Sequence, residues 1–330
     1  MSVSTTSDLE LAEAEAGAAV ELVAGGDIAA RSPWELFVRR FREDKFALVS
    51  IGFLVLLVLV AIFAPVVCSL VGAPGPYKAD TNALDLFGQP TGPSSAHLFG
   101  VDQLGRDVFS RVVYGARVSL LVAFVSTAIT TVIGVFLGLF AGYYRGWVDT
   151  LVSRTVDAWL AIPYLLLAIG LASACSFGTG CVGGLVKPGV PVVIAVIALT
   201  SWTYPARIIR GQVLSLREKE FVDAARSLGA SNRRIIVKEL LPNLAAPIIV
   251  FVTTFVPTAI LFEAALSFLG VGVQPPTPSW GQMISDASLN IQSQWWYMLF
   301  PGLALLFTVL AFNFVGDAMT DALNPRTRKS

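Results

Sequence analysis

Charged residues are scarce in this sequence. Only 14% of its 330 residues are charged, whereas 55% are apolar, and the mean hydropathy is +0.71. Ordinary soluble domains carry about 25% charged residues, so the chain lacks the polar surface that a water-soluble globule needs. Its formal net charge of +0 leaves no basic excess for binding nucleic acid. The composition therefore excludes an ordinary soluble protein and gives no support to a nucleic-acid-binding protein.

The side chains that carry most enzyme chemistry are also few. His97 is the only histidine, and no group of residues has the spacing of metal ligands. No GxxxxGK[ST] segment occurs, so the chain does not bind ATP through a P-loop. Serines are common, but none lies beside a base in a recognisable catalytic motif. We therefore predict a non-catalytic protein that binds no metal and no cofactor of its own.

Long apolar runs are present instead. A helix needs about 20 residues to cross the hydrocarbon core of a bilayer. Six runs are interpreted as spans. The fourth is short, so its lower end is expected to continue into 205–210. The predicted spans are 46–68, 118–142, 155–174, 190–204, 246–270 and 296–316. The chain is thus predicted to be an all-α membrane protein with about six transmembrane helices, kinked at the prolines inside them.

The basic residues predict an orientation. Under the six-span arrangement, one side of the membrane holds only Lys78, Arg106, Arg111, Arg117 and Lys187. All other lysines and arginines lie in the loops and terminal regions on the opposite side. Because cytoplasmic loops are enriched in lysine and arginine, both termini are predicted to be cytoplasmic.

The N-terminal region divides into two parts. Residues 1–30 contain acids but no lysine or arginine, which is unlike a signal peptide and predicts a disordered acidic tail. The sequence SPWE at 32–35 is typical of a helix start. Phe37 and Phe41 then share an apolar face, so 31–45 is predicted to be an interfacial amphipathic helix on the membrane lipid, or alternatively a soluble linker helix.

Three cysteines are too few for a disulfide framework. Cys175 and Cys181 nevertheless lie close together in one predicted outer loop, in the sequence CSFGTGC. A loop facing an oxidising compartment favours a disulfide between them, with two free thiols as the alternative. Cys68 is left without a partner in this interpretation.

The most charged long loop, 205–245, contains the stretch FVDAARSLGASNRRIIVKELLPN, 221–243. Its first part predicts a short helix with Phe221, Ala225 and Leu228 on one face. Gly229 is placed to end that helix as a left-handed C′ residue.

A second short helix is predicted to follow. Ser231 can cap it, Ile235, Ile236 and Leu240 form an apolar stripe, and Pro242 is expected to end it. Neither helix is long enough to be stable alone, so both need a protein surface. We interpret the pair as a docking element for a cytoplasmic partner; the alternative is a loop folded back on its own spans.

The same stretch resembles a known family motif. Asp223-Ala224-Ala225, Gly229 and Leu241-Pro242 are spaced as in the EAA loop, E-A-A-x3-G-x9-I-x-L-P, of binding-protein-dependent ABC importer permeases. Asp223 and Glu239 depart from that motif, which has glutamate and isoleucine there. In that family the loop forms a coupling helix that sits on the ATP-hydrolysing subunit. The resemblance implies an ATPase-coupling role for Phe221, Asp223, Ala224, Ala225, Leu228, Gly229 and Pro242.

Four further stretches are similar to one branch of that family. They are HLFGVDQLGRDVFSRVVYGARVSL (97–120), RTVDAWLAIPYLLLAI (154–169), ALSFLGVGVQPPTPSWGQMI (265–284) and GDAMTDALNPR (316–326). Together they resemble the dipeptide, oligopeptide and nickel permeases of the C-subunit type. The resemblance implies a type I permease domain over 46–330 in the bacterial cell membrane, with an outer loop at 69–117.

The resemblance also implies a function and partners. The chain would form half of a translocation path for di- or oligopeptides, with chelated nickel as the alternative cargo. Its partners would be a B-type permease, one or two ATPase subunits that hold ATP and Mg²⁺, and an extracytoplasmic substrate-binding protein. Rival interpretations are a secondary transporter or channel, and a membrane scaffold or sensor.

Two further groups are candidate contact sites. The segment 104–117 is predicted to be an amphipathic helix lying on the outer membrane face. There Asp102, Arg106 and Asp107 would contact a docked binding protein or the charged ends of the cargo, or alternatively would anchor the helix among lipid headgroups. Glu263 is the one acid well inside a span. A buried charge is costly, so we predict that it lines the translocation path; the alternative is packing against a neighbouring subunit.

Overall fold

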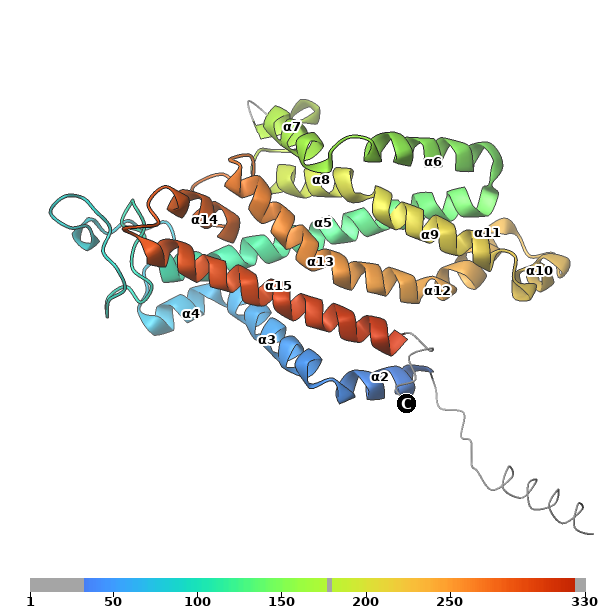
Figure 1. Ribbon diagram of the computed structural model, residues 1–330, viewed down its shortest axis with the longest axis horizontal. Helices are drawn as coiled ribbons and strands as arrows, with labels where there is room; N and C mark the ends of the chain where they lie inside the picture. The colour runs from blue at the N-terminus through green and yellow to red at the C-terminus, as the bar shows by residue number, and fades with distance from the viewer. Residues whose placement is uncertain (1–32, 177–179, 324–330) are drawn as a thin grey trace, which may run out of the picture.

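A computed structural model of the chain describes residues 33–176 and 180–323. Across these two ranges the fold is an elongated bundle of helices without a β-sheet (Figure 1). The short N-terminal helices are α2 (Pro33–Glu43), α3 (Lys45–Ile62) and α4 (Ala64–Val71). The middle of the chain forms α5 (Val108–Tyr144), α6 (Gly146–Leu160), α7 (Tyr164–Ser176), α8 (Val190–Ser201) and α9 (Thr203–Leu216).

The rest of the chain begins with α10 (Glu220–Ser227) and α11 (Asn232–Arg234). A π-helical segment, η3 (Ile235–Leu240), leads through α12 (Leu241–Asn243) into α13 (Ala245–Phe268). The last helices are α14 (Trp280–Ser288) and α15 (Trp295–Leu323). Two single 3-10 turns, η1 (Thr81–Ala83) and η2 (Val182–Gly184), lie in the loops.

The number of long apolar helices agrees with the sequence. Within the described residues, 5 helices are long and apolar enough to span a membrane: Lys45–Ile62, Val108–Tyr144, Val190–Leu216, Ala245–Phe268 and Trp295–Leu323. The helices α6 and α7 form a sixth span if their bent pair is counted as one. The prediction of an all-α membrane protein with about six spans is confirmed.

The predicted third span is not a single helix. Instead of one helix over 155–174, α6 and α7 meet at an angle of 87° on either side of a short break. Pro163 explains the break, because its ring disfavours helical backbone at Ile162 and it has no N–H to donate to the carbonyl of Trp159. The chain before Pro163 is instead held by a weaker contact, from the Ile162 N–H to the Trp159 carbonyl at 3.4 Å.

The start of the second span also differs from prediction. The segment 104–117 does not form a separate helix lying on the membrane face, because α5 begins at Val108 and continues for 37 residues. The Asp107 carboxylate caps this helix by accepting a hydrogen bond from the Ser110 N–H at 2.7 Å. At about 1.5 Å per residue, α5 is longer than the hydrocarbon core is thick. The fourth span does continue past 205–210 as predicted, through α9 to Leu216.

Small residues let α5 and α9 pack closely. A Cβ atom added at Gly138 would lie 2.4 Å from the carbonyl oxygen of Ala206, and one at Gly134 would lie 2.4 Å from Pro205. Only glycine fits at such distances, as in other closely packed membrane helices. The seam fixes α9, and with it the segment that follows, on the long central helix.

The two ends of the bundle carry different structures. At the α10 end lie α10 and α11, and at the α14 end lie α4, α14 and the loop over 72–107 (Figure 1). The helix α2 and the last turns of α15 both lie toward the α10 end, so the described chain begins and ends on that side. The predicted tail over 1–30 and the predicted cap at Ser32 lie outside the described residues.

Candidate functional site

The α10 end carries a short helix with a complete C-terminal cap. Gly229 has a φ of +77°, the left-handed conformation predicted for it. The Ala230 N–H donates to the Ala225 carbonyl at 3.0 Å, and the Gly229 N–H donates to the Arg226 carbonyl at 3.0 Å. These two bonds form a Schellman motif. The motif ends α10 sharply and turns the chain back toward the bundle.

The second half of the segment is fixed to the bundle. The Ser231 hydroxyl accepts a hydrogen bond from the Arg234 N–H, as predicted for a cap. The Tyr143 hydroxyl on α5 donates to Asn232 Oδ1 at 2.8 Å. The predicted stripe is buried in one core cluster with residues of α5 and α9: Ile235, Ile236 and Leu240 pack with Leu139, Tyr143, Ile209 and Val213. The stripe therefore serves the protein's own core.

Pro242 does not end the second helix, contrary to prediction. The Leu241 N–H donates to the carbonyl of Ile236, five residues back, so the helix widens into a π turn before the proline. In a regular α-helix the proline ring would clash with the carbonyl four residues earlier, and the wider turn changes that register. The Asn243 side chain then donates to the Glu239 carbonyl at 2.6 Å. Helical backbone thus continues past Pro242 to Asn243, and only Leu244 separates it from α13.

The exposed face of α10 differs partly from the predicted face. Val222 is 0% exposed and anchors α10, with Ala225 partly buried beside it. Phe221 is 38% exposed and Leu228 is 88% exposed. The apolar surface open to a partner is thus formed by Phe221, Ala224 and Leu228, and Ala225 belongs to the anchoring side. We call these three residues the α10 surface.

Ion pairs hold the base of this segment. The Arg210 Nη2 on α9 lies 2.9 Å from Asp149 Oδ2 on α6, in a partly buried pair. One turn earlier on α9, Arg207 pairs with Asp157 of α6 at 2.9 Å, and both side chains are mostly exposed. Arg217 donates to the Tyr143 carbonyl at the end of α5. The helix that leads into α10 is therefore attached to both α5 and α6.

A cavity of about 320 Å³ lies between α7, the α8–α9 junction and α13. It is lined by Tyr164, Ser201, Tyr204, Ile208, Phe251, Thr254, Phe255 and Thr258. The lining mixes hydroxyl groups with aromatic and aliphatic side chains, and it includes no charged residue. Sequence reasoning missed this group, because its members come from segments far apart in the chain.

Glu263 does not lie on this cavity. Its side chain is 0% exposed. Its carboxylate accepts hydrogen bonds from the Ser119 hydroxyl at 3.0 Å and from the Ser267 hydroxyl at 2.8 Å. The prediction that Glu263 lines the translocation path disagrees with this burial. The cost of burying this carboxylate is offset because serine hydroxyls from α5 and α13 donate hydrogen bonds to it.

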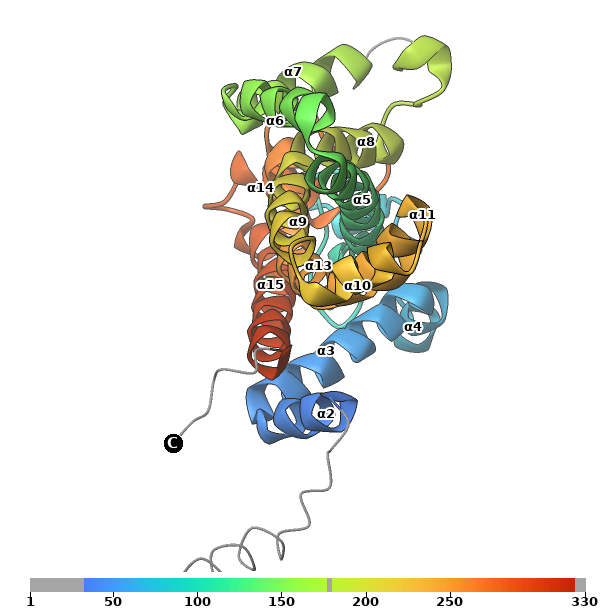
Figure 2. The same ribbon diagram turned by 90° about the vertical axis from the view of Figure 1, so that its right-hand side faces the viewer.

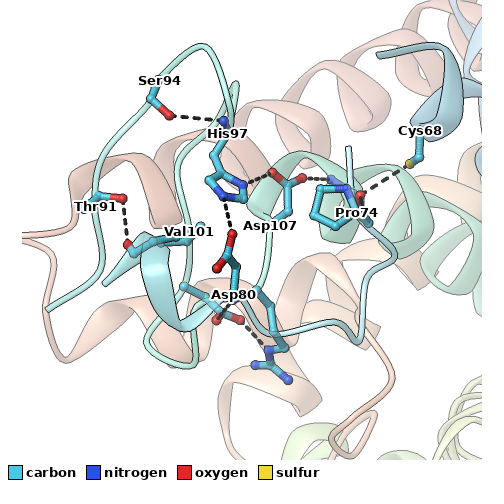
Figure 3. Close-up of polar contacts among 12 residues, drawn as sticks. Cys68, Pro74, Asp80, Thr91, Ser94, His97, Val101 and Asp107 are labelled. Carbon is cyan, nitrogen blue, oxygen red and sulfur yellow. Dashed lines mark hydrogen bonds and ion pairs between the residues drawn. The ribbon is translucent and has the colours of Figure 1, made fainter. Parts of the chain in front are cut away.

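At the α14 end, His97 joins two acids in the loop that precedes α5 (Figure 3). Its Nδ1 lies 2.8 Å from Asp107 Oδ2, and its Nε2 lies 3.8 Å from Asp80 Oδ2. The other oxygen of Asp107 caps α5. His97 is buried, so the imidazole connects the loop to the start of the long helix.

The predicted contact residues Asp102, Arg106 and Asp107 are brought together, but in the interior of this loop. Asp102 and Asp107 are each 1% exposed. Asp102 Oδ2 lies 2.7 Å from Arg106 Nε and 3.4 Å from Nε of Arg111, a fully buried arginine that sequence reasoning did not select. Asp102 is paired with two arginines, and Asp107 contacts His97 and the Ser110 N–H, so the two acids hold the loop fold. Their predicted contact with a docked protein does not agree with that burial.

The cysteines are arranged as the sequence interpretation favoured. Cys175 at the end of α7 is joined to Cys181 in a disulfide. Cys68 is free and buried.

Long apolar helices around a glycine-packed centre, with a short surface helix between two spans, define an integral membrane protein. Residues 134–329 match the family described as binding-protein-dependent transport system inner membrane component. Residues 32–90 match the N-terminal TM domain of oligopeptide transport permease C. The chain belongs to the binding-protein-dependent transport system inner membrane component family and is a multi-pass inner-membrane permease.

Individual relatives cover nearly the whole chain. The dipeptide transport system permease protein DppC of Alkalihalophilus pseudofirmus is 42% identical over 90% of this chain and 91% of its own length. The glutathione transport system permease protein GsiD of Shigella flexneri serotype 5b is 42% identical over 90% of this chain and 92% of its own. A chain of the MetNI methionine ABC transporter, solved in inward facing conformations, has a TM-score of 0.54 at 22% identity. It covers 66% of this chain and 97% of its own, and it supports the fold alone.

Proposed function

We propose that this chain is one of two permease subunits of an ATP-driven importer of di- or oligopeptides. It forms half of the translocation path and is coupled through the α10 surface to partner ATPases, which bind ATP and Mg²⁺. The other partners are a second permease of the B type and an extracytoplasmic substrate-binding protein. The relatives named for dipeptide and glutathione transport support a peptide cargo, with glutathione as the second candidate.

The observation that carries the coupling proposal is the exposure of Leu228. This leucine is 88% exposed although it is the C-cap of a helix whose opposite side is anchored in a core cluster. An apolar side chain on a rigid support is the usual form of an interface anchor. The anchoring through Val222 and Ile235 means that force applied at Leu228 reaches the spans without being absorbed by a loose loop.

The charge distribution supports a cytoplasmic position for the α10 end. Most lysines and arginines lie in the segments at that end, including 205–245 and the N-terminal segment before α3. Lysine and arginine are enriched on the cytoplasmic side of inner-membrane proteins. The α10 surface would then face the compartment that contains ATP.

The test is co-purification of the chain with the ATPases encoded beside it. Leu228→Glu places a charge on the α10 surface without changing the core, so we expect it to abolish retention of the ATPase. Leu289→Glu is the matched control, because Leu289 is 86% exposed at the α14 end. Retention of ATPase by the Leu228 variant at the wild-type level would overturn the coupling proposal.

Uptake by the assembled importer in proteoliposomes tests the cargo. Dialanine and glutathione are supplied separately with the binding protein and ATP. Accumulation of dialanine supports the peptide proposal, and accumulation of glutathione alone assigns the second candidate. Uptake of neither, with an active ATPase, would contradict both.

A further inference from the structure

The cavity between α7, α8, α9 and α13 lies where several helices are interrupted. Pro163 separates α6 from α7, Trp202 separates α8 from α9, and Pro257 lies inside α13. Figure 2 shows α7 and α8 side by side, and both α8 and α9 contact α13. Irregular backbone at membrane depth is tolerated where it lines a cavity or is buried in protein. Discontinuous helices are also typical of transporter substrate sites.

The α13 wall of the cavity offers hydrogen-bond acceptors. The Thr254 hydroxyl donates its proton to the Val250 carbonyl at 2.9 Å, and the Thr258 hydroxyl donates to the Thr254 carbonyl at 3.2 Å. Each hydroxyl has one proton and two lone pairs. Because both protons are used within the helix, the capacity that remains on these two oxygens is for accepting.

The facing wall offers donors. Ser201 is 1% exposed and lines the cavity, and its hydroxyl has no hydrogen-bond partner in the described part of the chain. An unpartnered buried hydroxyl costs free energy, and a ligand carbonyl that displaces the atoms covering it would remove that cost. Tyr164 and Tyr204 add phenol groups to the same lining, and a phenol can also donate.

A peptide bond matches these two walls. Its N–H suits the acceptors of Thr254 and Thr258, and its carbonyl suits the donors on the side of Ser201. It is neutral, whereas a charged peptide terminus would find no opposite charge in the lining. Phe251 and Phe255 supply apolar surface for small side chains. The volume of about 320 Å³ falls at the lower end of ordinary small-molecule sites, about 300–1,000 Å³.

We propose that this cavity binds the uncharged peptide bond of the cargo during its passage. The proposal rests on the proposed function as a peptide importer and names the part of the cargo recognised at this point. The charged ends of the peptide are then held elsewhere, in the solvent or by the second permease.

A thiol-protection experiment on the complex of the two permeases and the ATPases tests the proposal. Ile208→Cys provides a reporter thiol on the cavity lining, and Ile249→Cys provides an exposed reporter outside it. This chain adds little background labelling, since Cys68 is buried and the other two cysteines form a disulfide, and the complex without a reporter cysteine gives the background of the partner chains. The probes are dialanine and alanyl-N-methylalanine, which lacks the amide N–H.

We expect dialanine to slow maleimide labelling at Ile208→Cys but not at Ile249→Cys, and the N-methylated probe to protect weakly or not at all. Adding Thr258→Val should raise the half-protecting concentration of dialanine about 3- to 10-fold, the loss of one hydrogen bond. Thr253→Val is the matched control, because Thr253 lies on the same helix outside the lining and bonds only its own helix.

Three results would overturn the cavity proposal by itself. Equal protection by both probes would exclude recognition of the amide, and equal effects of Thr258→Val and Thr253→Val would exclude the acceptor role. Absence of protection in a complex that transports dialanine would exclude the cavity while leaving the proposed function intact. Absence of any peptide transport would instead contradict the proposed function, and the cavity proposal would fail with it.

Discussion

Ser119 on α5 donates a hydrogen bond to Glu263 on α13 at 3.0 Å, joining positions 144 residues apart in the sequence. The same serine oxygen lies 3.4 Å from the Trp280 N–H at the start of α14, and Ser267 completes the group. We expect Glu263→Ala to lower the free energy of unfolding by about 2–4 kcal/mol, since it leaves hydroxyls unpartnered and a void. Thermal unfolding in detergent measures this loss.

The variant Glu263→Gln separates two roles of this side chain. An amide of the same shape keeps one acceptor for a serine hydroxyl, so most of the stability lost in Glu263→Ala should return. Transport per folded molecule should remain near the wild-type rate. A large loss of transport in Glu263→Gln without loss of stability would instead indicate that Glu263 acts in the translocation path.

Two ion pairs between the same helices, α6 and α9, should differ in strength. Asp149–Arg210 is partly buried, whereas both partners in Asp157–Arg207 are more than half exposed. Exposed pairs contribute little because water and salt screen them. A double-mutant cycle on thermal stability should give a coupling of about 1–2 kcal/mol for the first pair and little for the second. Equal couplings would contradict this ordering.

The close glycine packing between α5 and α9 limits the size of the side chains that α5 can carry there. In Gly138→Ala the new Cβ would lie 2.4 Å from the Ala206 carbonyl, so the helices must separate. We expect a loss of about 1–3 kcal/mol, measured as a lower unfolding midpoint. Gly211→Ala is the control on α9 itself, because no atom lies within 4 Å of its added Cβ. That change should be neutral or slightly stabilising.

The disulfide between Cys175 and Cys181 provides a test of orientation. If this loop faces the oxidising side, intact cells should show no labelling by a membrane-impermeant maleimide until an impermeant reductant is added. Labelling that requires permeabilised cells would place the loop inside and reverse the proposed topology. Cys68 is buried and should stay unlabelled in both cases.

The parts of the 221–243 segment that sequence reasoning predicted well depend on local chemistry. Gly229 ends a helix because it tolerates a positive φ, and Ser231 caps the next one through its own hydroxyl. Such signals act within a few residues, so they can be recognised in the sequence. The break before α7 was equally local, since Pro163 marks it, but hydropathy alone joined the two helices into one span.

The partners of charged residues could not be predicted in the same way. Glu263 was expected on the translocation path because an acid in a span is costly, and the serine that satisfies it lies on α5. Asp102 was expected at the surface, yet Arg111 from the next helix accompanies it into the interior. The cavity lining is the clearest case, since Tyr164, Ser201 and Thr258 meet only in the folded chain.

The short connection between Pro242 and α13 has a mechanical consequence. Because only Leu244 separates α12 from α13, the segment over 221–243 is attached directly to the helix that carries the threonines of the cavity. From Ala245 to Thr258 that helix is about 20 Å long at 1.5 Å per residue. A tilt of α13 by about 10° around its Ala245 end would move Thr258 by about 3 Å. That displacement is about the length of one hydrogen bond, so a small tilt of α13 is enough to break a contact made by the threonine hydroxyls.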